Sequence, residues 1–108
     1  MKRGSVPESG DVILAQVPFT DTSEVKLRPA LVLFRDHGNF VIAGITSNLK
    51  MDGIPLLRSE GAVKDSVIKL NYIFTISDEM VYKTIFHLNE MKRKLVRDGL
   101  VKYLDDLL

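Results

Sequence analysis

Short apolar runs separated by polar turn residues make up residues 12–76 of the chain. Runs of this length, rich in β-branched residues and bounded by Gly, Pro, Asn or Asp, are typical of short β-strands. The residues Asp36 to Asn39, with His37-Gly38 at their centre, have the composition of a hairpin turn. The pattern predicts an antiparallel meander of three strands and then three more strands, at Val12–Val17, Ala30–Phe34, Phe40–Ile45, Ile54–Leu57, Val63–Leu70 and Phe74–Ile76.

Pro55 indicates that the fourth predicted strand lies at an edge of the sheet or at a bulge, because proline cannot donate a hydrogen bond to a neighbouring strand. Six short strands in so few residues favour a small, strongly bent antiparallel sheet or a partly open barrel. The expected fold class is therefore α+β, mainly β.

The last part of the chain changes to a helical period. Asn89 is a candidate N-cap, and Gly99 indicates either a break in the helix or a close contact with a neighbouring element. Ser77 is a candidate cap of a second, shorter helix over Asp78 to Met80. An amphipathic C-terminal helix packed on the sheet is predicted from the apolar residues Met91, Leu95, Val96, Leu100, Tyr103, Leu104 and Leu107.

Composition limits the classes of function. The chain has 108 residues, which suits one domain, and its 45% hydrophobic and 27% charged residues are ordinary for a globular protein. With no cysteine and two isolated histidines we expect no disulfide and no metal or other cofactor. The net charge of +1 means that any nucleic-acid contact must come from a local basic patch.

We expect residues 1–9 to form a flexible leader and residues 10–108 to form a single domain. No apolar run is long enough to span a bilayer, and the N-terminus lacks the apolar core of a signal peptide. A cytoplasmic protein without membrane contact is the expectation.

The dipeptide Arg28-Pro29 indicates a candidate phosphate-binding residue. Proline restricts the residue before it to an extended conformation, so Arg28 is expected at a strand entrance with a defined backbone. A guanidinium held in this way suits a phosphate group. The alternative is an ordinary surface arginine paired with Asp21 or Glu24.

The segments GDVILAQVPFTD (residues 10–21) and RPALVL (residues 28–33) resemble the opening of the MazF/PemK (Kid-like) toxins of bacterial toxin-antitoxin pairs. Four further matches follow in the family's order, at Ile45-Thr46-Ser47, Lys64-Asp65-Ser66-Val67-Ile68, Phe74-Thr75-Ile76 and His87-Leu88. The resemblance covers residues 10–104 and implies an SH3-like, CcdB/MazF-like barrel.

The resemblance implies a metal-independent, sequence-specific endoribonuclease for single-stranded RNA, in which the ribose 2′-hydroxyl attacks its own phosphate and leaves a 2′,3′-cyclic phosphate. Arg28 and Thr46 match the catalytic pair of the family. A strand threonine making only a cross-strand contact is the alternative for Thr46. Candidate RNA-binding residues are Phe19, Thr20, Lys26, Ser47, Lys50, Asp65, Lys69 and Asn71.

Several positions depart from the Kid-like pattern. Kid-like members carry a base aspartate and a nearby arginine where this chain has Asn71 and Lys69, and asparagine cannot accept a proton. Asp65 is a fallback base, or else the cap of a turn. We interpret His37 and His87 as structural residues. Either Arg28 and Thr46 suffice for catalysis, or activity is weakened or lost.

Two other functions are alternatives to the endoribonuclease. One is a protein-binding module on the same fold, as in the gyrase-poisoning CcdB relatives, and the other is a catalytically weakened relative. The partners implied by the family are single-stranded RNA, a second copy of the chain in a homodimer, and an acidic antitoxin, with any DNA contact made only through that antitoxin. The loop Thr20–Leu27 is expected to be poorly ordered in the free protein and to close when the antitoxin binds.

Overall fold

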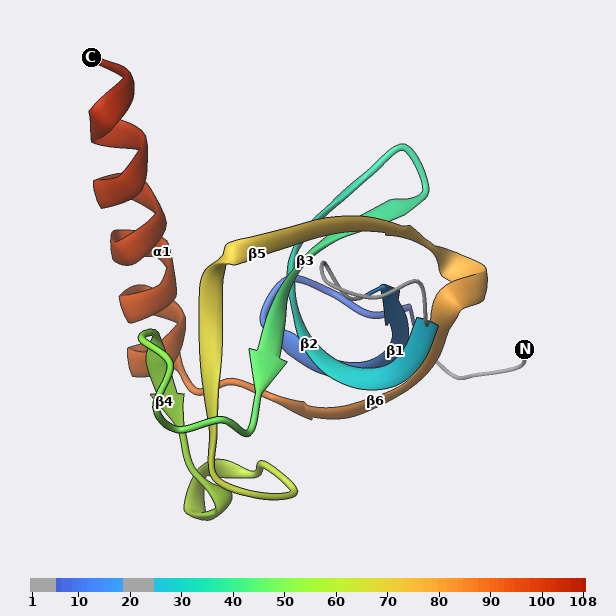
Figure 1. The fold of residues 1–108 in the computed structure, drawn as a ribbon. Helices are drawn as coiled ribbons and strands as arrows, with labels where there is room; N and C mark the ends of the chain where they lie inside the picture. Colours follow the sequence, from blue (N-terminus) through green and yellow to red (C-terminus); the bar gives the residue numbers. More distant parts are fainter. Residues whose placement is uncertain (1–5, 19–24) are drawn as a thin grey trace.

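Residues 6–18 and 25–108 are described by the structure, which is a computed structural model. In these ranges, one antiparallel sheet of six strands curls into a half-barrel, and a single α-helix stands beside it (Figure 1). The strands are β1 (Asp11–Pro18), β2 (Val25–Asp36), β3 (Asn39–Thr46), β4 (Ile54–Leu56), β5 (Ser66–Ser77) and β6 (Val81–His87), and their order across the sheet is β4-β5-β3-β2-β1-β6. The strongly bent, mainly β fold predicted from the sequence is confirmed.

The predicted meander is present as β1, β2 and β3. The hairpin turn between β2 and β3 closes at the Asp36–Asn39 pair, with positive φ angles of 53° at His37 and 82° at Gly38. Two successive residues of positive φ form the tight turn that matches the twist of antiparallel strands. Pro55 lies in β4 at one edge of the sheet, as its missing donor requires.

The two strands predicted at Val63–Leu70 and Phe74–Ile76 are halves of one strand, β5. Pairing with β3 jumps from Ala43–Ile73 to Gly44–Lys69, which leaves residues 70–72 as an irregularity in the ladder. β5 turns sharply between its two halves, so that they run in different directions (Figure 1). The residues between the halves form a bulge within one strand, and bulges of this kind bend a strand and increase its local twist.

The region after β5 differs from the prediction. Residues 78–80 do form a short 3₁₀ helix, η2 (Asp78–Met80), but the Ser77 side chain makes no capping hydrogen bond. The chain then enters β6, which the sequence analysis did not identify and which pairs with β1. β6 is rich in β-branched and aromatic residues, which favour strands, and only Val81 among its residues is buried.

Both faces of the sheet bury apolar side chains. Neighbouring residues such as Val12 and Ile13, or Leu31 and Val32, join opposite clusters because side chains alternate along a strand. One cluster includes Leu88 and Val96, the second of which belongs to the helix, and the other includes Phe40, Ile42 and Val81. This explains why the strands read as nearly continuous apolar runs.

The helix α1 (Glu90–Leu104) begins at the predicted cap, where the Asn89 side chain accepts a hydrogen bond of 2.8 Å from the Lys92 amide. Only part of its predicted apolar face packs against the sheet, because α1 runs on past the sheet (Figure 1). Val96 is buried and Leu100 is partly buried. The rest of that face is exposed, at Met91, Leu95, Tyr103, Leu104 and Leu107.

Gly99 lies inside a continuous helix, so the close-contact alternative holds: a Cβ there would lie 2.6 Å from Leu70 Cδ1. The packed part of the chain begins before the expected Gly10. Pro7 is fully buried, and the Glu8 amide donates a hydrogen bond of 2.9 Å to Asp11.

Candidate functional site

Arg28 and Thr46 lie on the same face of two adjoining strands. β2 and β3 pair at Ala30–Gly44, and each of the two candidates lies two residues beyond that pair, Arg28 before Ala30 and Thr46 after Gly44. Residues two apart on a strand share a face. Arg28 is not at the strand entrance that was predicted but within β2, paired with Ala15 of β1. Its backbone is therefore held by the sheet.

The Thr46 hydroxyl is oriented by the chain that follows it. Thr46 Oγ1 accepts a hydrogen bond of 3.1 Å from the Asn48 amide, and Asn48 Oδ1 accepts one of 3.1 Å from the Lys50 amide. A hydroxyl that accepts from a backbone N–H keeps its own hydrogen for another acceptor. Thr46 is half-buried at the end of β3, so a phosphate oxygen can serve as that acceptor.

A cavity of about 520 Å³ opens beside Arg28. Its polar lining residues come from three parts of the chain and are cationic or carry a hydroxyl, namely Lys26, Arg28, Ser47, Lys64 and Ser66. The remaining lining is apolar and includes Leu14, Ile45, Leu56, Ile85 and Phe86. The residues on either side of Thr46 line this cavity, although Thr46 itself does not. The cationic lining residues Lys26, Arg28 and Lys64 are called the cationic rim below. An apolar lining combined with these residues fits a ligand that joins an anion to a flat or aliphatic group.

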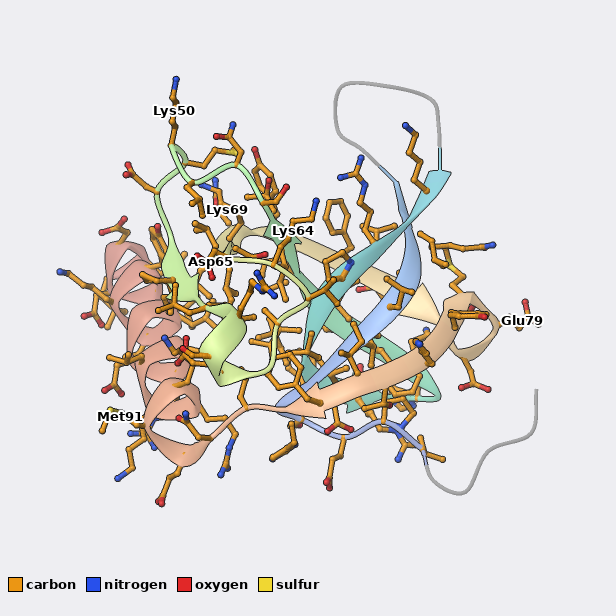
Figure 2. All side chains as sticks on the ribbon, turned by 90° about the horizontal axis from the view of Figure 1, so that it is seen from below. Lys50, Lys64, Asp65, Lys69, Glu79 and Met91 are labelled. Carbon is orange, nitrogen blue, oxygen red and sulfur yellow. The ribbon has the colours of Figure 1, made fainter. Side chains whose placement is uncertain are left out.

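The loop before β5 brings Lys64 to the cavity. Ser66 Oγ donates a hydrogen bond of 2.8 Å to the Lys64 carbonyl, and Asp65 Oδ1 accepts one of 2.9 Å from the Arg58 amide. Asp65 thus acts as the turn cap that the sequence analysis gave as its alternative, and it does not line the cavity. Figure 2 shows Lys64 and Asp65 on this loop.

Lys69 has a different position from the other predicted RNA-binding lysines. Its side chain is buried, and Nζ donates a hydrogen bond of 2.6 Å to the Asp52 carbonyl and lies 5.3 Å from the centre of the Tyr72 ring. Figure 2 shows Lys50 pointing away from the body of the protein. Asn71 is exposed and lines a separate groove beside α1. Lys50, Lys69 and Asn71 therefore do not line the cavity of Arg28.

Phe19 and Thr20 lie outside the described residues, as does most of the predicted loop Thr20–Leu27. The described end of that loop, from Val25, belongs to β2, so this part is strand and not loop.

The two histidines lie away from the cavity. His87 Nδ1 lies 2.8 Å from Asp11 Oδ1, and since a carboxylate only accepts, Nδ1 donates. With Glu8 these residues form the one cluster, among the residues that the structure describes, whose ligand atoms lie within 4.8 Å of one another, as a metal ion would require. Both Asp11 oxygens already have hydrogen-bond partners.

Two parts of the cavity were missed by the sequence analysis. Ser66 was read only as part of a family motif, and Ile85 and Phe86 belong to the strand β6 that was not predicted. The high content of β-branched and aromatic residues from Val81 to Phe86 is the signal that could have identified that strand.

Comparison with known proteins places the chain in one family. The model of the PemK-like, MazF-like toxins of type II toxin-antitoxin systems matches residues 8–104. A comparison with curated protein sequences finds no match. Within the described ranges, no helix is long and apolar enough to cross a membrane.

Several solved structures share the fold. MazF from Deinococcus radiodurans is 20% identical, with a TM-score of 0.73 over 94% of this chain and 99% of that chain. Toxin MazF-mt6 of Mycobacterium tuberculosis is 22% identical, with a TM-score of 0.72 over 88% and 96%. A mycobacterial endoribonuclease in complex with its cognate antitoxin is 12% identical, with a TM-score of 0.71 over 92% and 93%.

Proposed function

This chain belongs to the PemK-like, MazF-like toxin family of type II toxin-antitoxin systems, and we propose that it is an endoribonuclease that cleaves single-stranded RNA without a metal ion. The observation that carries the proposal is the register of β2 and β3, which holds Arg28 within β2 on the face that it shares with Thr46. The cavity that Lys26 and Lys64 line adjoins Arg28, but its apolar lining belongs to the opposite face of the sheet.

In the proposed reaction the ribose 2′-oxygen attacks the adjacent phosphorus, the bond from phosphorus to the 5′-oxygen breaks, and the products are a 2′,3′-cyclic phosphate and a 5′-hydroxyl. Negative charge increases on the non-bridging oxygens and on the leaving oxygen. The planar guanidinium of Arg28 can donate to two oxygens at once, and the Thr46 hydroxyl can donate to a third. Lys26 and Lys64 at the cavity rim can bind neighbouring phosphates.

The proton of the 2′-hydroxyl leaves to solvent in this scheme, and the departing 5′-oxygen takes a proton from solvent. Of the described residues that line the cavity, none carries a carboxylate or an imidazole. Asp65 is engaged with the Arg58 amide, and Asn71 cannot accept a proton. The rate therefore depends mainly on charge stabilisation by Arg28 and Thr46.

A protein-binding module that does not cut RNA is the second candidate, and the absence of an acid or base in the described cavity lining favours it. The partner in either case is an antitoxin whose acidic, extended segment would bind the cationic rim. A related endoribonuclease has been solved with its cognate antitoxin. The exposed apolar residues of α1 support a homodimer.

Incubation with a long single-stranded RNA in EDTA tests the proposal. We expect discrete cuts ending in 2′,3′-cyclic phosphates, lost in Arg28→Ala and retained in Arg97→Ala, which removes an exposed arginine of α1 instead. A folded wild-type protein that cuts no RNA contradicts the enzyme and leaves the binding module.

A further inference from the structure

The β4–β5 loop, residues 57–65, forms one wall of the cavity beside Arg28. Ala62, Val63 and Lys64 line the cavity from this loop. Gly61 rests on the Phe86 ring so closely that a Cβ would lie 2.7 Å from a ring carbon, with a φ of 120° that favours glycine. The depth of the cavity and the position of the Lys64 ammonium therefore depend on where this loop lies.

One side chain of α1 contacts both β4 and the first turn of this loop. Lys92 Nζ donates a hydrogen bond of 2.6 Å to the Pro55 carbonyl in β4 and lies 3.1 Å from Glu60 Oε2. The other carboxylate oxygen of Glu60 accepts a hydrogen bond of 2.8 Å from the Leu57 amide. The two contacts of the Lys92 ammonium group connect α1 to β4 and to the loop, and the third fixes Glu60 within the loop.

This ion pair differs from a usual surface ion pair. The Lys92 and Glu60 side chains are only 13% and 23% exposed, whereas the Lys94–Glu90 pair on the same helix is 64% and 74% exposed at 3.8 Å. Exposed pairs of the second kind contribute little, because solvent screens them. The Lys92 amide is itself held by the Asn89 cap, so the side chain extends from a backbone position that is fixed.

The ionisation of Glu60 agrees with this geometry. Burial raises its pKa, but the hydrogen bond from the Leu57 amide and the hydrogen bond and charge of Lys92 outweigh burial, and the pKa lies below its ordinary value of 4.5. Glu60 is therefore charged at neutral pH and available to the ammonium.

We infer that Lys92 is a positioning residue for substrate binding: through Glu60 and Pro55 it holds loop 57–65 against Phe86 and so sets the cavity wall and the position of Lys64, in a cavity that Arg28 also lines. Lys92 does not line the cavity and touches no reacting atom. The inference rests on the proposed function for its effect on RNA. Its structural part, the tethering of the loop, does not.

Amide hydrogen exchange and RNA cleavage kinetics together test the inference. Lys92→Met keeps the length of the side chain and removes its charge, and Lys94→Met makes the same change in net charge two residues away. We expect amides 57–65 to exchange about tenfold faster in Lys92→Met, the effect of losing a charge-assisted hydrogen bond. The same variant should raise KM by a similar factor and leave kcat within about twofold. Lys94→Met should change neither quantity.

A conservative variant separates positioning from general destabilisation. Lys92→Arg, which keeps a positively charged donor for the Pro55 carbonyl and for Glu60, should restore much of the exchange protection and of KM. Equal exchange of residues 57–65 in Lys92→Met and Lys94→Met overturns the inference, as does a change confined to kcat. If the wild type cuts no RNA, the proposed function fails, and the exchange experiment alone decides whether Lys92 tethers the loop.

Discussion

Arg28 of β2 and Thr46 of β3 share one face of the sheet, each two residues beyond the Ala30–Gly44 pair. The two residues are 18 positions apart in the chain (46 − 28) and meet only because the β2–β3 hairpin has this register. A shift of one residue would turn one of them to the opposite face. The register of this hairpin is therefore part of the proposed catalytic site.

Arg28→Lys tests whether a planar donor is needed. Lysine keeps the positive charge and loses the fork of donors that can bind two phosphate oxygens. We expect the cleavage rate to fall by about 100-fold, as when an oxyanion donor is removed. The measurement is the rate with a short fluorescent RNA in EDTA, alongside a thermal melt. A lysine variant as fast as the wild type would show that charge alone is sufficient.

Thr46→Val tests the hydroxyl. Valine has the same shape, but it cannot donate to a phosphate or accept from the Asn48 amide. We expect cleavage to fall by about 10- to 100-fold and Thr46→Ser to recover most of it. Thr75→Val, at an exposed threonine of β5, is the matched control and should be neutral. Equal rates for the two valine variants would remove Thr46 from the site.

Asn89→Ala tests the start of α1. The lost side-chain hydrogen bond to the Lys92 amide should lower the free energy of unfolding by about 1 kcal/mol. Urea denaturation measures this value. Asn89→Asp retains an acceptor and should remain within a few tenths of a kcal/mol of the wild type. A larger loss in Asn89→Asp than in Asn89→Ala would contradict the role of the side chain as a cap.

Gly53→Ala tests the seating of the loop that follows Thr46. A Cβ at Gly53 would lie 2.4 Å from the Ile68 carbonyl oxygen, a backbone atom that cannot move alone. We expect a loss of about 1–3 kcal/mol, the usual cost of overpacking. Gly99→Ala is the matched control. There the nearest atom, Leu70 Cδ1, is the end of a flexible side chain, and alanine favours the helix, so its stability should stay near that of the wild type.

The lowered pKa of Glu60 predicts a pH dependence of stability. A carboxyl group with a lower pKa in the folded than in the unfolded chain stabilises the fold above the unfolded value, here 4.5, and loses this effect as pH falls through the folded pKa. The stability difference between the wild type and Glu60→Gln should therefore be constant near neutral pH and shrink on acidification below 4.5. Urea midpoints across this range measure it, and a stability difference that does not change between neutral pH and pH below 4.5 would contradict the prediction.

The prediction of the fold was accurate where local signals were strong. The hairpin at His37-Gly38, the edge position of Pro55 and the cap at Asn89 each depend on a few adjacent residues, and all three are confirmed. The bend within β5 and the strand β6 were missed. A bulge in a single strand and a loop between two strands have similar sequences, and only pairing with β3 distinguishes them.

The residues of the candidate site were predicted unevenly for a related reason. Arg28, Lys26 and Ser47 do line one cavity, whereas Lys69 is turned inward to the Asp52 carbonyl. Charge by itself does not indicate whether a strand lysine faces solvent or a backbone acceptor. The cavity wall at Phe86 could not be expected without β6.

By itself, the sequence determined the number and order of most strands, the C-terminal helix, the family and the identity of the candidate pair Arg28 and Thr46, because these depend on local pattern and motif. Only the tertiary structure decided which side chains share a cavity, that Lys69 and Asp65 are engaged with backbone groups, and that Lys92 of α1 reaches the loop before β5. Those facts depend on strand register, on the bulge in β5 and on the docking of α1. Each of these arises from burying two apolar faces at once, a property of the whole chain and not of any segment.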